Sequence, residues 1–212
     1  MTLRRHRAVL ALVLSLAVVT LTGRWALAGV PSDQLRGQID RVIKVLEDPE
    51  LKKEGHAKDR RAAVRKIAND IFDFSETARR SLGRHWQGRT PAERDEFVQL
   101  FSDLLERSYI SKIETYGGEK IQYTAERADG DLATVSTRII TKNGTEVPVD
   151  YRMIKRADRW LVYDVSIEGV SLVSNYRTQF NKIIQTTSYN ELVSKLRNKQ
   201  DELLAEDKKK KP

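Results

Sequence analysis

The chain has 212 residues, no cysteine, and 38 lysine and arginine residues against 30 aspartate and glutamate residues, which gives a formal net charge of +8. The lack of cysteine excludes disulfide bonds, thiol chemistry and cysteine-ligated zinc or iron–sulfur sites. A hydrophobic content of 40% and a charged content of 32% predict a globular chain of one large or two small domains.

Residues 1–28 have the pattern of a secretory signal peptide. A cluster of arginines precedes the apolar run Ala8–Val19, which is short for a membrane span, and Ala26-Leu27-Ala28 fits a cleavage site that leaves Gly29 as the first mature residue. An uncleaved anchor is the alternative. The segment holds four arginines and no acidic residue, so its removal lowers the net charge from +8 to +4. A nucleic-acid partner thereby loses its main support, and export without cysteine suits a bacterial periplasm.

The first part of the mature chain is predicted to be helical. One helix is expected from Ser32, as its N-cap, to just before Pro49. The charged stretch 50–61 predicts a loop or a solvated first turn. Helical spacing then resumes, and a short helix is expected over Asp73–Gly83, where Gly83 serves as the terminating glycine.

The next helix has the clearest start signal in the chain. Thr90 is expected to cap it, Pro91 occupies the first helical position, and Glu93 completes a capping box. Apolar residues follow at every fourth position: Phe97, Phe101, Leu105, Tyr109 and Ile113. Gly117-Gly118 is predicted to end this helix.

The composition then changes to four runs with β-strand character: Lys120–Arg127, Leu132–Ile140, Glu146–Arg156 and Trp160–Glu168. Short turn sequences separate them, which predicts an antiparallel meander, because parallel neighbours need long crossovers. In the last run a period of two predicts one apolar face: Leu161, Tyr163, Val165 and Ile167.

Two helices are expected after the last strand, the second starting at a Ser188–Glu191 capping box, and residues 201–212 are predicted to form a disordered basic tail. Residues 29–200 are therefore predicted to form one domain. Its class is α+β, with helices packed on one curved antiparallel sheet of about four strands.

Catalytic motifs are weakly represented. The mature chain has two histidines, His56 and His85, which we interpret as surface or capping residues, and their spacing does not indicate a metal site. Asp150 and Asp164 lie on neighbouring predicted strands and leave two interpretations open. They are paired carboxylates of an exported enzyme or, as we favour, structural partners of arginines such as Arg152.

Four blocks carry a resemblance to a known family: Asp73–Trp86 (DFSETARRSLGRHW), Phe97–Tyr109 (FVQLFSDLLERSY), Val147–Met153 (VPVDYRM) and Trp160–Phe180 (WLVYDVSIEGVSLVSNYRTQF). They occur in the same order in the MlaC family, also called toluene-tolerance or phospholipid-binding proteins. The chain resembles this family from about Ser32 to about Asn198.

The resemblance implies a periplasmic carrier without enzymatic activity. Its cargo would be a phospholipid in a hydrophobic cavity between sheet and helices, with no cofactor. It would pass the lipid between an outer-membrane lipoprotein complex and an inner-membrane ABC transporter that carries an MCE-domain protein, acting as a monomer that binds no nucleic acid. A hopanoid-related lipid carrier, an exported enzyme and a structural adaptor with a filled core are the alternatives.

Periodicity and the resemblance together select fifteen residues as the expected lipid-binding set: Phe97, Phe101, Leu104, Leu105, Tyr109, Val147, Val149, Tyr151, Met153, Tyr163, Val165, Ile167, Val173, Tyr176 and Phe180. Ordinary core packing would account for the same positions. The lipid headgroup is expected at the cavity mouth in water. Three arginines leave two interpretations open, attraction of a phosphate or an acidic partner, or a solvated helix face: Arg79, Arg80 and Arg84.

Overall fold

The structure is a computed structural model that describes residues 30–209. The predicted signal peptide and the last three residues lie outside this range. Within it, no helix is both long enough and apolar enough to cross a membrane.

The described residues form six α-helices, one short 3₁₀ helix and one five-stranded sheet. The helices are α1 (Val30–Glu47), α2 (Ala57–Ile71), α3 (Phe74–Leu82), η1 (Gly83–Trp86), α4 (Pro91–Ile113), α5 (Leu172–Thr186) and α6 (Tyr189–Lys209). The strands are β1 (Lys120–Asp129), β2 (Leu132–Ile140), β3 (Glu146–Arg156), β4 (Arg159–Ile167) and β5 (Val170–Ser171). All strand neighbours are antiparallel and follow chain order, so the predicted α+β class and meander are confirmed.

Local side-chain chemistry sets several helix starts. At α4 the Thr90 hydroxyl accepts a hydrogen bond from the Glu93 amide at 3.2 Å, and the Glu93 carboxylate accepts one from the Thr90 amide at 2.7 Å. The predicted capping box is therefore present, and it satisfies two amides that the first turn leaves unpaired. At α6 the Ser188 hydroxyl accepts from the Glu191 amide at 3.1 Å.

Two predicted boundaries are wrong. The first helix begins at Val30, so Ser32 is not its cap, and the Ser32 amide instead donates to the Glu126 carboxylate on β1 at 2.8 Å. The stretch 50–61 is, as predicted, a loop as far as residue 56 followed by the solvated first turn of α2, which starts at Ala57. The expected tail is helical through Lys209, because 201–209 continue a regular α6 that has no helix-breaking residue.

Strand β4 departs from strict alternation. Asp164 pairs with Arg152 and Val162 with Met153, so the strand contains one extra residue, Tyr163, between these pairs. The bulge interrupts the alternation, so Val162 before it and Val165 after it face the same side of the sheet, opposite Met153 and Tyr151 of β3. Val162 is completely buried in the core, and the predicted apolar face is wrong at this point.

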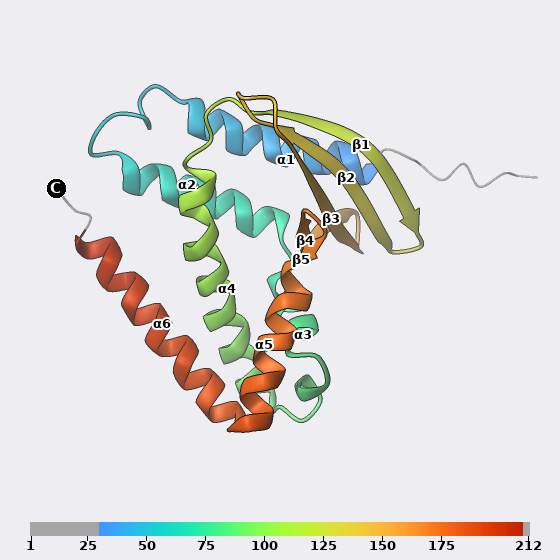
Figure 1. The fold of residues 1–212 in the computed structure, drawn as a ribbon, viewed down its shortest axis with the longest axis vertical. Helices are drawn as coiled ribbons and strands as arrows, with labels where there is room; N and C mark the ends of the chain where they lie inside the picture. Colours follow the sequence, from blue (N-terminus) through green and yellow to red (C-terminus); the bar gives the residue numbers. More distant parts are fainter. Residues whose placement is uncertain (1–29, 210–212) are drawn as a thin grey trace, which may run out of the picture.

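Two lobes with separate cores make up the molecule (Figure 1). The sheet lobe contains β1–β4 with α1 and α2, and the helical lobe contains α3–α6. The core of the sheet lobe is formed by Leu35, Ile67, Ile71, Ala133, Val135, Met153 and Val162. The core of the helical lobe is formed by Ala78, Leu82, Phe97, Leu100, Phe101, Leu105, Phe180, Tyr189, Leu192, Val193 and Leu196. Helix α4 extends from the helical lobe to the sheet lobe, where Ile110 packs with Leu46 and Val64.

Candidate functional site

Four aromatic rings form a continuous cluster between α4 and α5. Phe101 lies at its centre, with ring centroids 5.7 Å from Phe97, 4.9 Å from Tyr176 and 5.1 Å from Phe180. Most of these pairs are edge-to-face, the arrangement that the aromatic quadrupole favours. The three phenylalanines are buried, whereas Tyr176 is half-buried. The cluster therefore ends in one aromatic ring that reaches the surface.

Tyr176 sits in an apolar environment despite its partial exposure. Burial, and next the neighbouring Tyr109 phenol, raise the pKa of Tyr176 to about 12. The ring is therefore neutral at any physiological pH. Tyr109 and Leu104 on α4 are also half-buried and pack against the same core, and Leu105 is buried within it. These side chains form an uncharged surface at the edge of the helical lobe.

A second group of the fifteen residues lies on the sheet. Met153 and Val149 are buried on β3, while Tyr151 and Val165 pair across β3 and β4 and pack against the core of the sheet lobe. Burial raises the pKa of Tyr151, so this phenol is neutral as well. Val147, at the beginning of β3, is half-buried.

The remaining three residues have different surroundings. Tyr163 is the bulged residue and lies under the Arg80 guanidinium, whose carbon is 4.0 Å from the ring centroid. Val173 is buried in the first turn of α5. Ile167, at the end of β4, is exposed. The structure thus divides the expected set between two lobes instead of placing it on one continuous wall.

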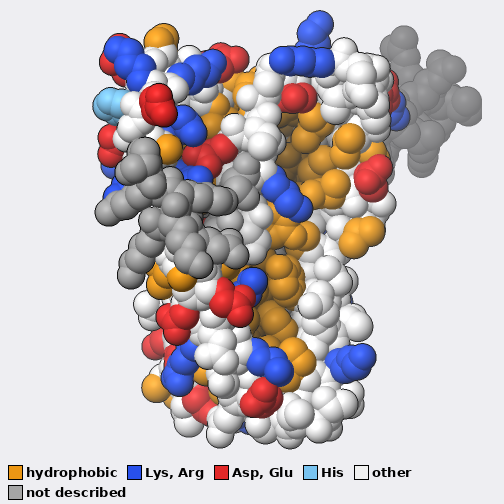
Figure 2. Space-filling view, turned by 60° about the vertical axis from the view of Figure 1, so that its left-hand side comes forward, with side chains coloured by type: hydrophobic (Ala, Val, Ile, Leu, Met, Phe, Trp, Pro, Cys, Tyr) orange, Lys and Arg blue, Asp and Glu red, His pale blue; other side chains and the backbone are white. Residues whose placement is uncertain are grey.

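Figure 2 shows an apolar strip on one face of the molecule. The strip is hollowed and runs lengthwise over both lobes, from the sheet lobe at the top of the view to the helical lobe at the bottom. Charged side chains border the strip on both sides. An elongated apolar furrow with a polar rim suits a ligand that is itself long and apolar.

Two further hollows lie along α1 and differ from the furrow. One, of about 400 Å³, is lined by Asp40, Ile43, Lys44, Glu47, Asp48 and Pro49. The other, of about 430 Å³, is lined by Asp33, Gln34, Gly37, Gln38, Arg41, Asp70, Arg159 and Trp160. None of the fifteen expected residues lines either hollow, and the mixed charges of both make them poor sites for an acyl chain.

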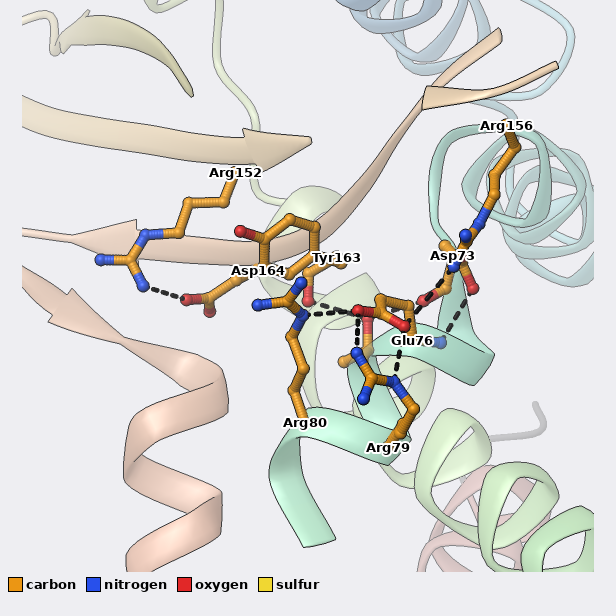
Figure 3. A network of polar contacts seen from close by, with 9 residues as sticks. Asp73, Glu76, Arg79, Arg80, Arg152, Arg156, Tyr163 and Asp164 are labelled. Carbon is orange, nitrogen blue, oxygen red and sulfur yellow. Dashed lines mark hydrogen bonds and ion pairs between the residues drawn. The ribbon is translucent and has the colours of Figure 1, made fainter. Parts of the chain in front are cut away.

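A network of charged residues joins α3 to the sheet (Figure 3). The buried Glu76 carboxylate accepts hydrogen bonds from Arg79 at 2.6 and 2.8 Å and from Arg80 at 2.6 Å, and Arg156 reaches it at 3.5 Å. The bonds from Arg79 have the largest influence and, with those from Arg80, lower the pKa of Glu76 to about 2 against the opposing effect of burial. Asp73 accepts a further bond from Arg156 at 2.8 Å.

A second carboxylate fixes the connection between β4 and α5. Asp164 is buried and accepts hydrogen bonds from the Ser171 hydroxyl at 2.6 Å and the Val173 amide at 3.0 Å, with Arg152 at 3.3 Å. These contacts satisfy the first turn of α5 and set its angle to the strand. Asp150 faces Ser166 on β4 and is half-buried. Asp164 is thus bound to Arg152, as expected if this aspartate has a structural role.

Sequence reasoning missed Glu76 altogether. The signal was present, because Arg79 and Arg80 stand three and four residues after it, the spacing at which helical side chains meet. Its burial was not visible in the sequence, since that depends on β4 packing over α3. Arg84, grouped with these arginines at first, binds Asn181 on α5 instead, at 2.9 Å.

The described residues offer little for a metal ion. Within 30–209, no group of three or more histidine and acidic side chains is arranged to hold one.

Comparison with known proteins shows consistent similarities. The family model described as MlaC protein matches residues 36–198. The chain is 25% identical over 138 residues to the intermembrane phospholipid transport system binding protein MlaC of Haemophilus influenzae, a match that covers 61% of this chain and 64% of that protein, less than two thirds of its length. It is 23% identical over 185 residues to the toluene tolerance protein ttg2D of Pseudomonas putida, covering 85% of this chain and 82% of that one.

A solved structure agrees with these matches. The phospholipid-binding protein of Ralstonia solanacearum, determined in complex with a phospholipid, superimposes with a TM-score of 0.71 at 27% identity. The superposition covers 81% of this chain and 97% of that one.

Proposed function

Because the chain belongs to the MlaC family, we propose that it is a periplasmic carrier that binds one phospholipid in the apolar furrow that runs over both lobes. The observation that carries the proposal is the similarity to a protein solved with a phospholipid bound, over most of both chains. The apolar strip in Figure 2 is a surface of the right character for acyl chains.

The energetics of lipid extraction explain why the furrow must be apolar. Each methylene group that leaves a bilayer for water costs about 0.8 kcal/mol, so two acyl chains of ordinary length cost on the order of 25 kcal/mol. A carrier has to replace nearly all of this burial. The half-buried side chains at the edges of both cores are suited to it, since they have apolar surface left to cover: Leu104, Tyr109, Tyr151, Val165 and Tyr176.

The phosphate of the headgroup has the opposite requirement. A buried phosphate without partners is costly, so the headgroup stays at the mouth of the furrow in contact with water. Weak headgroup selectivity follows from this placement. A rigid polycyclic lipid, as in a hopanoid carrier, remains the second candidate for the same apolar furrow.

The carrier's route is part of the proposal. The lipid travels between an outer-membrane lipoprotein complex and an inner-membrane ABC transporter with an MCE-domain protein. The protein itself performs no chemistry on the lipid. The position of Asp164 supports this assignment, because its oxygens hold the first turn of α5 and are not presented to a ligand.

The direct test is to purify the protein from residue 29 onward without detergent and to identify extracted lipids by mass spectrometry. We expect about one phospholipid per chain with mixed headgroups, as a single furrow of this kind holds one elongated ligand. Recovery of a polycyclic lipid would favour the second candidate. A protein that contains no lipid and takes none from labelled vesicles would contradict the proposal.

A matched pair of substitutions on α5 tests where the lipid binds. Tyr176→Glu introduces a carboxylate at the edge of the aromatic cluster, and we expect it to reduce lipid content strongly because a charge there lacks a partner. Gln179→Glu adds the same charge at an exposed position of the same helix and should leave the lipid content unchanged. Equal lipid content in both variants would place the lipid elsewhere.

A further inference from the structure

In the charged network of Figure 3 the acidic groups lie inside the protein and the arginines lie nearer its surface. Its carboxylates lie inside, with side-chain exposures of 10% for Asp73, 5% for Glu76 and 1% for Asp164. Three of the four arginines bound to them are exposed, at 47% for Arg79, 48% for Arg152 and 50% for Arg156, and Arg80 is half-buried at 31%. The surface over this network therefore presents guanidinium groups, while the opposing charges lie beneath.

These guanidinium groups are held in place before any partner arrives. Arg79 is fixed through two of its nitrogens, and Arg80 is bound to Glu76 on one side and stacked on the Tyr163 ring on the other. Arg152 uses a single terminal nitrogen for Asp164, so the rest of its planar fork faces outward. Ordering an arginine fork in advance reduces the entropy lost when it binds a carboxylate.

The register of the sheet places the nearby exposed aliphatic side chains on its other face. Val170 pairs with Ile167, and Ile167 pairs with Val149, so these side chains face the side of the sheet opposite to the paired Arg152 and Asp164. The surface over the network is therefore formed by the arginines themselves, a residue type that is enriched at protein–protein interfaces.

Charge distinguishes a protein partner from a bilayer. Four arginines and three carboxylates leave the network with a net charge of only +1. Long-range attraction to an anionic bilayer depends on accumulated net charge, typically from flexible basic clusters. Guanidinium groups that are held in place, with a small net charge, bind instead through short, directed hydrogen bonds. Such bonds suit carboxylates at fixed positions on a folded protein surface.

We propose that Arg79, Arg80, Arg152 and Arg156 form a docking surface for an acidic protein surface. The proposal rests on the carrier function above, because a carrier has to dock on the complexes that load and unload it. Helix α3 and the start of α5 both contact β4 beneath this surface. A docked partner would therefore lie over the connection between the helical lobe and the sheet.

The test uses the lipid-loaded full mature protein and the purified inner-membrane transport complex of the same organism in nanodiscs. Arg152→Gln is the informative variant, since Asp164 keeps its bonds from Ser171 and Val173. We expect it to weaken docking about tenfold, the size of one charge-assisted hydrogen bond. Arg152→Lys, which keeps the charge but loses the fork, should restore only part of this loss.

Arg138→Gln is the matched control. Arg138 is also a half-exposed strand arginine with one cross-strand carboxylate partner, Glu146, but it lies outside the network. It should dock as the unaltered protein does. Native mass spectrometry of each variant reports phospholipid loading, which tests the carrier function independently, and thermal unfolding reports folding.

Three results would overturn the proposal. The first is Arg152→Gln docking within twofold of the unaltered protein. The second is equal losses for Arg138→Gln and Arg152→Gln, which would indicate general charge attraction. The third is binding of the unaltered protein to phosphatidylglycerol vesicles without binding to the complex, which would assign the surface to a membrane.

Discussion

The aromatic cluster between α4 and α5 and the charged network around Glu76 and Asp164 stabilise the helical lobe in different ways. The cluster buries large rings that contact each other over broad surfaces. The network buries small carboxylates that accept a few short, directed hydrogen bonds. Ring burial contributes most of the free energy of folding but tolerates a range of angles, whereas directed bonds specify the angle at which α3 and α5 meet β4. Substitutions in the cluster and in the network should therefore have different effects on stability.

Phe101→Ala has the largest expected effect. Phe101 is buried and contacts three other rings, so its removal leaves a cavity that the surrounding helices fill only partly. We expect the free energy of unfolding, measured by urea denaturation, to fall by about 3–5 kcal/mol. Tyr109→Phe, which keeps the ring at the edge of the same core, is the control. A loss below about 1 kcal/mol for Phe101→Ala would show that the cluster is not the main source of stability.

Acid should weaken the network before it affects the cluster. The pKa of Glu76 is lowered from its ordinary value of 4.5 to about 2, so the folded state holds the ionised form more strongly than the unfolded chain does. The resulting stability is fully present above pH 4.5 and is lost as the pH falls through about 2, an effect of roughly 3 kcal/mol.

Glu76→Gln isolates this contribution from that of other carboxylates. The difference in unfolding free energy between the unaltered protein and the variant should be largest at pH 6 and should shrink steadily below pH 4.5. If the difference in unfolding free energy stays constant down to pH 2, the charge of Glu76 does not stabilise the contact between α3 and the sheet.

Asp164→Asn should cost about 2 kcal/mol, because the amide cannot accept from both Ser171 and Val173 as well as the carboxylate does. Asp150→Asn, at a half-buried position on the neighbouring strand, should change the unfolding free energy by less than about 0.5 kcal/mol. Lipid transfer by the Asp164 variant should follow its stability. Loss of a measurable turnover in a fully folded Asp164→Asn protein would instead support the enzyme hypothesis.

The smallest effects concern two glycines with opposite surroundings. Gly37 lies within α1, and no neighbouring atom lies within 4 Å of the position that a new Cβ would take, so Gly37→Ala should stabilise the protein by about 0.5–1 kcal/mol. Gly83 ends α3 at a φ of +57°, where a new Cβ would also lie 3.2 Å from the Arg177 side chain. Gly83→Ala should therefore destabilise the protein, and thermal unfolding should move the two variants in opposite directions.

Elements whose signals are local could be predicted from the amino-acid order alone. The capping box at Thr90 and the limits of β2 and β3 came out as predicted, because capping and turn chemistry depend on residues within a few positions of each other. The family blocks likewise identified the MlaC family. For the candidate site, periodicity selected residues that face a core. A sequence pattern identifies the apolar face of an element, but it does not show which other elements pack against that face.

Which core each residue joins, and which charges are buried, depends on how the helices pack on the sheet. The bulge at Tyr163 depends on the register between β3 and β4, and it placed Val162 in the core against the expected alternation. The burial of Glu76 and Asp164 depends on α3 and α5 packing against β4. These buried environments are formed by residues that lie far apart in the chain. The contacts that stabilise them therefore form only when the helices and the sheet pack together.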